Sequence, residues 1–325
     1  MKVFRSLLEV PADFGPSVVT IGNFDGVHCG HRTVIAEVIA RAKARSAKAV
    51  LVTLDPHPTR VLKPERELRL ITPTATKLEL LAETGLDAVL LLPFTPEYAK
   101  TSAQEFCRTV LHDALHAAEV HEGENFRFGY GAEGDTHSLE ALGATLGFTA
   151  QTFAPIASGA AAISSSRIRQ AIAAGEMADA RHMLGREFFV DSTPASGRGY
   201  GTKYAVPTIN LATYDDLLPA NGVYITDLRV GSESFEGVTN VGNRPTFGAD
   251  SFAVETYLLR FHPVDMTEQT PLRMTFHKRL REERKFDSPD ALKAQIFKDV
   301  ARAERWFTLR RVVGSPAPPA RVTGS

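Results

Sequence analysis

The chain has 325 residues, of which 43% are hydrophobic and 23% are charged, and its formal net charge is -1. This length accommodates two ordinary domains that each bury their own core, and the composition is typical of a globular protein. The balanced charge excludes the overall basic character of a nucleic-acid-binding or membrane-surface protein, so a polyanionic substrate would have to be held by a local arrangement of donors.

Cysteine usage and the first residues of the chain indicate where the protein works. The two cysteines, Cys29 and Cys107, form no CxxC zinc pattern and do not suit a disulfide framework. The first residues lack a signal-peptide pattern, and no apolar run approaches the roughly 20 residues of a membrane span. We therefore expect a cytoplasmic protein, a monomer or weak homo-oligomer, whose partners are small molecules and neither nucleic acid nor membrane.

The first half of the chain alternates predicted strands with predicted helices. The strands are predicted at 18–21, 49–54, 88–92, 119–121 and 150–153, and the helices at 33–44, 77–83 and 105–116. Strands separated by helices of this length indicate βαβ units and a parallel, Rossmann-like sheet of the α/β class. Ligands of such sheets bind at the carboxyl ends of the strands, often against a helix N-terminus.

The pattern changes near residue 186. Residues 191–202 are rich in glycine and serine and indicate a loop. Strands without helices between them then favour an antiparallel β-barrel, and they are predicted at 223–230, 235–241, 253–261 and 272–277. A final helix is capped by Ser288, begins with Pro289 and carries its apolar face on residues 292, 296, 300, 303 and 307. The predicted domains are 1–185 and 186–313, followed by a disordered tail over 314–325.

A glycine-rich turn that carries two histidines follows the first long predicted strand, with the sequence GNFDGVHCGHR. The glycines that allow a tight turn and close approach to a ligand are Gly22, Gly26 and Gly30, and Asn23 adds an uncharged donor. His28 and His31 lie three residues apart, so they share a face where the turn winds into a helix. Two imidazoles at a helix N-terminus suit nucleotide phosphates and the charge of a leaving pyrophosphate. The alternatives are a surface pair with chance spacing, or a metal site for which no third ligand is evident.

Two later segments strengthen this interpretation. They are GENFRFGYGAEGD, at 123–135, and ISSSRIRQAI, at 163–172. Together with the histidine turn, they resemble the HxGH-bearing nucleotidyltransferases, and most closely the bacterial bifunctional riboflavin kinase/FAD synthetases. The resemblance covers nearly the whole chain. It implies a substrate pocket that includes Phe24, Asp25, Asn125 and Phe128.

The side chains of these segments have physical interpretations of their own. Ser164 and Ser165 offer helix caps and hydroxyl donors, and Arg169 near the helix start suits triphosphate oxygens, although simple capping also explains the serines. The rings of Phe126 and Phe128 either pack on the sheet or contact a flavin. The mechanism that the resemblance implies is attack of the FMN phosphate on the α-phosphorus of ATP, with pyrophosphate expelled and FAD formed.

The second half resembles the riboflavin kinase module of the same family. Pro207-Thr208-Ile209-Asn210 is similar to its PTxN signature, whose threonine and asparagine ligate the Mg²⁺ of ATP. Glu255 lies where the family has its catalytic carboxylate, which accepts the proton of the ribityl hydroxyl as riboflavin becomes FMN. A lone glutamate in a strand otherwise tends to face solvent.

The loop before this signature departs from the family pattern. The family has an arginine there, whereas this chain has Lys203, and the backbone around Gly199 and Gly201 would supply further donors to phosphates. We therefore expect a bifunctional enzyme that uses ATP and Mg²⁺ in both reactions. The alternatives are an FMN adenylyltransferase whose second module has become a flavin-binding or structural domain, and a flavin- or nucleotide-binding regulator without turnover.

Overall fold

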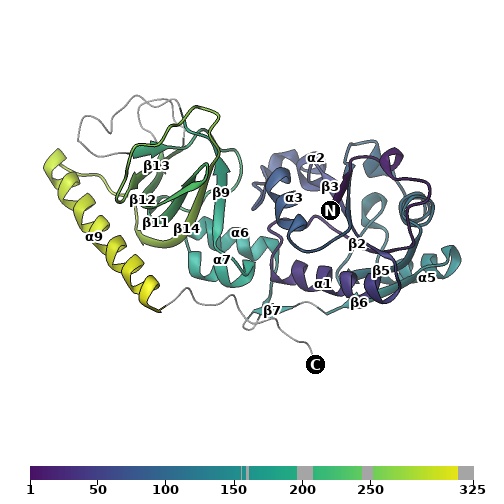
Figure 1. Cartoon of the computed structure of the whole chain (residues 1–325). Coiled ribbons are helices and arrows are strands. Elements are labelled where there is room, and N and C mark those ends of the chain that lie inside the picture. The colour runs from purple at the N-terminus through teal and green to yellow at the C-terminus, as the bar shows by residue number, and fades with distance from the viewer. Residues whose placement is uncertain (155, 159–160, 196–207, 244–251, 314–325) are drawn as a thin grey trace. The chain divides into compact units, whose positions relative to one another are not determined.

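The computed structural model describes residues 1–154, 156–158, 161–195, 208–243 and 252–313 (Figure 1). The chain divides into two compact units, Met1–Ser165 and Ser166–Ser325. A six-stranded sheet lies at the centre of each unit. The tail predicted over 314–325 lies outside the described residues.

The sheet of the first unit is parallel throughout, as predicted, with the strand order β1-β4-β3-β2-β5-β6. Its strands are β1 (Lys2–Phe4), β2 (Ser17–Ile21), β3 (Lys48–Asp55), β4 (Ala88–Pro93), β5 (Ala117–Gly123) and β6 (Thr149–Phe153). From β2, the strands β3, β4 and β1 extend the sheet on one side, and β5 and β6 extend it on the other. The carboxyl ends of β2 and β5 therefore form the switch point at which α/β sheets bind their ligands.

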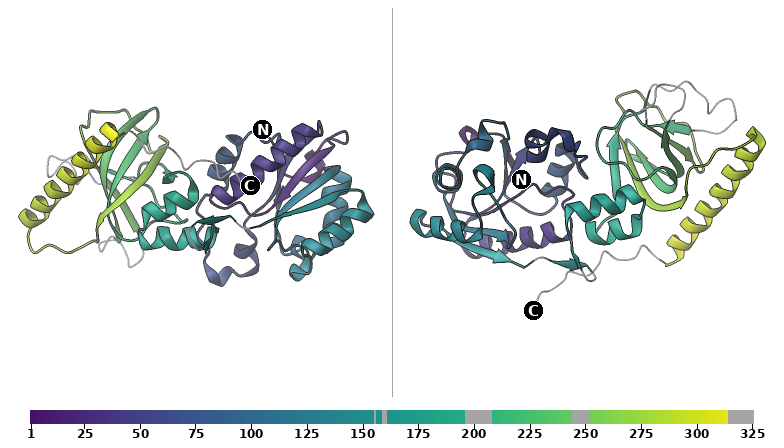
Figure 2. Two further views of the ribbon diagram at one scale, coloured as in Figure 1. Left: turned by 90° about the horizontal axis from the view of Figure 1, so that it is seen from below. Right: turned by 180° about the vertical axis from the view of Figure 1, so that it is seen from behind.

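Helices cover both faces of this sheet (Figures 1 and 2). They are α1 (Cys29–Ala44), α2 (Pro58–Leu62), α3 (Thr74–Ala82), α4 (Ala103–Phe106), which continues as a π-helix (Cys107–Ala114), and α5 (Thr136–Leu146). Helix α1 lies against β2, β3 and β5. On the other face, Val19 and Val50 join a core with Val110 and Leu139. A short hairpin of β7 (Ala157–Ser158) and β8 (Ala161–Ala162) follows β6.

The second unit contains a curled antiparallel sheet, again as predicted, with the order β10-β13-β12-β11-β14-β9. Its strands are β9 (Phe188–Ser192), β10 (Thr208–Asn210), β11 (Gly222–Val230), β12 (Glu233–Asn243), β13 (Phe252–Leu258) and β14 (Leu272–Arg281). The residues after β9 bond to the end of β10, with Ala195 N donating to Asn210 O at 2.9 Å and Ala212 N to Thr193 O at 2.8 Å. This seam joins the two edges of the sheet and closes the barrel.

Two helices that precede the barrel pack with it. They are α6 (Ser165–Ala174) and α7 (Met177–Leu184). Helix α7 contacts β9 and β14, and the carbonyl of Ile172 accepts a hydrogen bond from Ala220 N. Because of these contacts the two units divide between Ser165 and Ser166, earlier in the chain than the predicted boundary after residue 185.

The last helix, α9 (Pro289–Val313), begins as predicted, with the Ser288 hydroxyl accepting from Ala291 N at 3.2 Å. Its second half packs on the barrel through Ala303 and Phe307, whereas Leu292 in its first half is 41% exposed. The predicted apolar face is therefore buried only in part. Neither α9 nor any other helix in the described part of the chain is long and apolar enough to cross a membrane.

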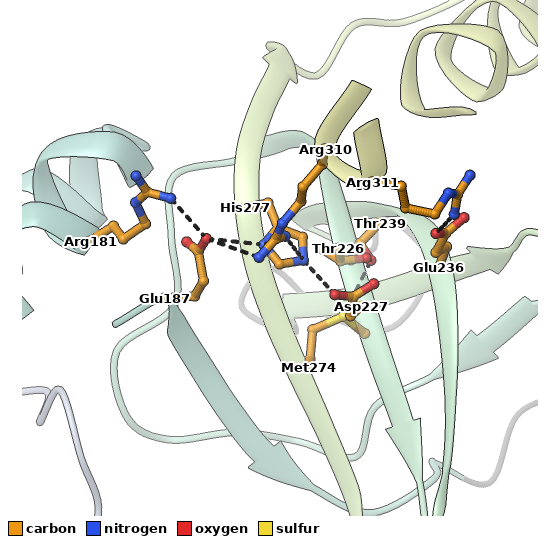
Figure 3. A network of polar contacts seen from close by, with 10 residues as sticks. All are labelled: Arg181, Glu187, Thr226, Asp227, Glu236, Thr239, Met274, His277, Arg310 and Arg311. Atoms are coloured by element: carbon orange, nitrogen blue, oxygen red, sulfur yellow. Dashed lines mark hydrogen bonds and ion pairs between the residues drawn. The ribbon is translucent and has the colours of Figure 1, made fainter. Parts of the chain in front are cut away.

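The buried side chain of His277 on β14 contacts residues of both the barrel and α9 (Figure 3). The His277 ring lies 2.7 Å from Asp227 Oδ2 through Nε2 and 3.4 Å from Glu187 Oε1 through Nδ1, and it stacks on Trp306 of α9. Arg310 of α9 contacts both the ring and Glu187. Burial alone would lower the pKa of His277, but the hydrogen bonds to Asp227 and Glu187 outweigh it and raise the pKa.

The packing of α6 and α7 leads to a prediction about separability. A fragment of residues 166–313 should melt cooperatively at a higher temperature than one of residues 186–313, because the shorter fragment loses the buried side chains of both helices, among them Ile172, Met183 and Leu184. Losing even one such contact typically costs about 2–5 kcal/mol. Circular dichroism melts of the two fragments measure the difference, and equal midpoints would show that the helices add nothing to the barrel.

Candidate active sites

The turn between β2 and α1 has a strained backbone. Phe24 has φ 49°, Gly26 φ 88° and Val27 φ 40°, all in the left-handed region. Glycine adopts this conformation freely, but a β-branched residue such as Val27 rarely does. Each non-glycine residue held there costs roughly 1–3 kcal/mol, so the surrounding contacts must hold the turn in place.

Asp25 supplies the main anchor of this turn. Its side chain is 3% exposed, and its carboxylate accepts from Thr72 N at 2.9 Å and from Ile71 N at 3.1 Å. The Thr72 hydroxyl also accepts from Gly26 N at 2.9 Å. The segment before α3 therefore fixes the middle of the turn, and the Asp25 carboxylate is directed at protein backbone.

The turn ends in the predicted histidine pair. His28 is the N-cap of α1, with Nδ1 accepting from His31 N at 3.3 Å. The two rings stack with centroids 3.5 Å apart and planes 16° from parallel. A Cβ on Gly30 would lie 3.2 Å from the His28 ring, so glycine leaves room for this ring. The rings therefore stand together at the N-terminus of a helix that follows the switch-point strand.

The charge state of the pair follows from its surroundings. Burial first, and then the neighbouring charges of His28 and Lys77, hold the pKa of His31 well below its ordinary value. His31 is therefore a neutral imidazole at neutral pH when no ligand is present. Its Nδ1 atom is buried and has no hydrogen-bond partner among the described residues.

The other residues predicted for this site lie in different environments. The Ser165 hydroxyl donates to the carbonyl of Asp25 at 2.9 Å, so it joins the turn, and Ser164 lies half-buried beside it in the chain. Asn125 is exposed on the segment after β5. Phe128 is 8% exposed and packs against Phe106 in the core, with the half-buried ring of Phe126 stacked on it at 5.2 Å. The structure thus shows Phe128 packed in the core of the first unit.

Two remaining residues of the turn lie at its start. A Cβ on Gly22 would lie 3.2 Å from the Phe24 ring, and the Phe24 ring in turn contacts His31 at a centroid distance of 4.9 Å. Glycine at this position therefore allows Phe24 to pack against the ring of His31.

Arg169, the last residue predicted for this site, lies half-buried on α6, in the second unit.

The second predicted site lies on the barrel, where strand register brings its residues together. Asn210 of β10 pairs with Glu255 of β13, and Glu255 pairs on its other side with Asn240 of β12. Thr208, two residues before Asn210, points to the same face of the sheet. These four side chains are all half-buried. The three predicted residues and Asn240 thus form one patch of oxygen-bearing side chains.

The position of this patch relates it to α9. Thr208 pairs with Tyr257, and Tyr257 packs in the cluster under α9 together with Val238. The pair of Glu255 and Asn240 is the next pair on the same face of the sheet, two residues along each strand.

Three residues predicted for the second site, Gly199, Gly201 and Lys203, lie outside the described residues. Within the described ranges, no group of three or more His, Cys, Asp or Glu side chains could hold a metal ion.

Comparisons with known proteins match both halves of the chain. The family model for FAD synthetase matches residues 10–167, and the one for riboflavin kinase matches residues 184–307. A protein from Pseudomonas fluorescens named bifunctional riboflavin kinase/FMN adenylyltransferase is 33% identical over 93% of this chain and 97% of its own length. The chain belongs to the bifunctional riboflavin kinase/FMN adenylyltransferase family. A relative with the same name from Escherichia coli K12 is 32% identical over 96% of this chain and 99% of its own length.

A solved structure agrees with the fold of this family member. It is a crystal structure described as a macrolide-efflux protein from Streptococcus pneumoniae, which is 26% identical to this chain. The alignment covers 94% of this chain and 98% of that one, with a TM-score of 0.84. The likeness therefore extends through both units.

Sequence reasoning missed several residues that lie against the candidate site residues. Thr72 and Lys77 contact the histidine turn from the segment before α3 and from α3 itself, and Asn240 lies beside Glu255 on the neighbouring strand. A buried lysine in an otherwise ordinary helix gave no local signal for the first site. Asn240 lies in the strand predicted at 235–241, so a polar side chain at that position was a usable signal.

Glu122 is a further missed residue, at the switch point itself. It is 3% exposed, and its carboxyl accepts a hydrogen bond from Ile21 N, beyond the last paired residues of β2 and β5, Val19 and Val120. Burial raises the pKa of Glu122 well above its ordinary value and outweighs the hydrogen bonds from Ile21 and Thr20. The folded protein therefore keeps this carboxyl protonated at a pH where the unfolded chain has released the proton.

Because of this raised pKa, we expect Glu122→Gln to increase the free energy of unfolding by an amount that depends on pH. Above the ordinary pKa of 4.5, ionisation of Glu122 stabilises the unfolded state. The free energy of unfolding therefore falls as the pH rises toward the pKa of Glu122 in the folded protein. The variant lacks this loss, and its stability relative to the unmutated protein should rise by up to about 1.4 kcal/mol per pH unit in that window. Denaturant unfolding at several pH values measures it. Glu124→Gln, at an exposed neighbour, is the control, and a difference that does not change with pH would contradict the assignment.

Proposed function

We propose that the protein phosphorylates riboflavin to FMN in its second unit and adenylylates FMN to FAD in its first, with ATP as the donor in both reactions. Family membership and the match of each half to one activity support this proposal. The observation that carries the adenylyl-transfer half is the stacked His28–His31 pair at the N-terminus of α1, directly after a switch-point strand.

In the first unit, an FMN phosphate oxygen attacks the α-phosphorus of ATP. A new phosphorus–oxygen bond forms, the bond to the β-phosphate oxygen breaks, and pyrophosphate leaves. The FMN phosphate is already anionic at neutral pH, so no general base is required, and catalysis comes from positioning and charge stabilisation. The two histidines and the backbone N–H groups at the start of α1 hold the phosphates that become pyrophosphate, and Asn23 and Ser164 contribute further donors.

Replacing one histidine should affect one activity only. His31→Ala removes a donor that acts on the leaving pyrophosphate, and we expect FMN adenylylation to fall about 10²-fold while riboflavin phosphorylation is unchanged. Chromatographic separation of riboflavin, FMN and FAD after incubation with ATP measures both activities. His112→Ala, at an exposed histidine of the same unit, is the control. Undiminished FAD synthesis by His31→Ala would rule out this role.

In the second unit, the patch on the barrel supplies the groups for phosphoryl transfer. The side-chain oxygens of Thr208 and Asn210 share a face and suit Mg²⁺, a hard cation that prefers oxygen ligands, so these residues would hold the ion. Bound there with ATP, Mg²⁺ supplies neutralisation of phosphate charge. Glu255, directly opposite Asn210, accepts the proton of the ribityl hydroxyl as that oxygen attacks the γ-phosphorus and ADP leaves.

The carboxylate of Glu255 can be tested without changing its shape. Glu255→Gln removes the proton acceptor, and we expect loss of FMN formation from riboflavin by at least about 10²-fold, the lower range for general-base catalysis. FMN supplied directly should still be converted to FAD at the unmutated rate. Glu282→Gln, at an exposed glutamate just after β14, is the matched control. Normal FMN formation by Glu255→Gln would show that another group takes the proton.

The same assay separates this proposal from its alternatives. An adenylyltransferase with a degenerate second module would make FAD from FMN but no FMN from riboflavin, and a regulator would do neither. The intact Thr208, Asn210 and Glu255 set favours a working kinase. We also propose a cytoplasmic location and small-molecule partners only, in keeping with Cys29 and Cys107, which are not joined in a disulfide.

A further inference from the structure

The ladder between β2 and β5 ends before the two strands do. Its last pair is Val19 and Val120. On their outer sides the strands continue to pair, β2 with β3 as far as Ile21, and β5 with β6 as far as Gly123. At the carboxyl edge of the sheet, each of the two strands is therefore held by its outer neighbour, and the ladder no longer joins them to each other.

The side chain of Glu122 joins the two strands where the ladder has ended. It is 3% exposed, and its carboxyl accepts hydrogen bonds from Ile21 N and from the Thr20 hydroxyl. A ladder bond holds neighbouring strands about 4.8 Å apart, whereas a bond made through a glutamate side chain lets the two backbones lie farther apart. Glu122 thus connects β2 and β5 without closing the edge at which α/β sheets bind their ligands.

The residue that Glu122 holds is the last one before the histidine turn. Ile21 ends β2, and the turn that presents the two imidazoles begins directly after it. Asp25 fixes the middle of this turn through the segment before α3. Glu122 fixes the start of the turn from the other strand of the switch point. The two carboxyl groups therefore hold the turn at two points, from two different parts of the sheet.

The protonation of Glu122 suits this position. Burial raises the pKa of its carboxyl well above the ordinary value, so the group keeps its proton at a pH where exposed glutamates are ionised. A protonated carboxyl brings no negative charge toward a bound triphosphate, and its carbonyl oxygen still accepts from Ile21 N. A glutamine side chain has nearly the same shape, the same lack of charge and the same acceptor.

We propose that Glu122 is a positioning residue for adenylyl transfer, whose side chain joins β2 to β5 beyond their ladder and so sets where the histidine turn begins. This inference rests on the proposed function of the histidine pair. Glu122 acts through Ile21 and needs no contact with a reacting atom. A buried N–H without an acceptor is costly, so without Glu122 the end of β2 would move toward the backbone of β5 to find one, and the turn would move with it.

The test compares two substitutions of Glu122 in the full-length protein. Glu122→Gln keeps an acceptor for Ile21 N, whereas Glu122→Met has a similar length and removes the acceptor. We expect Glu122→Met to lower kcat for FMN adenylylation about 10²-fold, the size of loss that follows from misplacing a reacting group, and Glu122→Gln to keep the unmutated rate. Riboflavin phosphorylation should be unchanged in both, and Glu140→Met, at an exposed glutamate of α5, should change neither activity.

A double-mutant cycle separates positioning from a general loss of folded protein. If Glu122 acts by placing the histidine turn, Glu122→Met should cost much less in His31→Ala protein than in the unmutated protein, because the imidazole that it misplaces is already absent. A loss through partial unfolding would cost the same factor in both backgrounds, and that result would overturn the inference. Circular dichroism melts show which variants are folded at the assay temperature.

Glu122→Asp provides the same test if Glu122→Met does not fold. It keeps a carboxyl but is shorter by one methylene, so it no longer reaches Ile21 N from β5, and kcat for FMN adenylylation should fall. Unmutated kcat in a folded Glu122→Met or Glu122→Asp protein would overturn the inference, and so would a Glu122→Gln protein that loses adenylylation. If His31→Ala alone leaves FAD synthesis intact, the proposed function of the pair fails, and this inference fails with it.

Discussion

The geometry of the first site depends on the Asp25 carboxylate. The turn that presents the histidines holds Phe24 and Val27 in left-handed conformations, which their own side chains disfavour. Hydrogen bonds from Ile71 and Thr72 to Asp25 compensate for this strain, and they come from a segment 46 and 47 residues away in sequence. Without them, the start of α1 would relax and the two imidazoles would lose their common orientation.

The two sites use different ways of bringing polar groups together. In the first unit, the carboxyl ends of parallel strands and the N-terminus of a helix converge on one edge, so backbone dipoles and a short turn do most of the positioning. In the second unit, cross-strand register alone sets Asn240, Glu255 and Asn210 side by side. The first arrangement suits a diffuse polyanion. The second suits a compact cation and a single proton transfer.

Local patterns made the histidine pair predictable, because a strand, a glycine-rich turn and a helix follow one another directly in the sequence. The helix cap at Ser288 was predictable for the same reason. Lys77 and Thr72 were not, since their roles arise from tertiary contacts that leave no periodic signal. Strands β9 and β10 are short, with β10 only three residues long, and sequence patterns could not distinguish them from loops. The juxtaposition of Asn210 and Glu255 was expected from family resemblance alone.

The position of β10 at the seam of the barrel has a thermodynamic consequence. The strand carries Thr208 and Asn210, yet it is held by pairing with β13 on one side and by a few backbone bonds to residues 193–195 on the other. Short edge segments of this kind open locally at a lower free energy than the strands in the centre of a sheet. A ligand that contacts both β10 and β13 binds only the form in which β10 is paired. Binding of the ligand therefore stabilises the pairing of β10, and a more stable pairing increases the affinity for the ligand. Amide hydrogens along this seam would then report occupancy of the proposed kinase site.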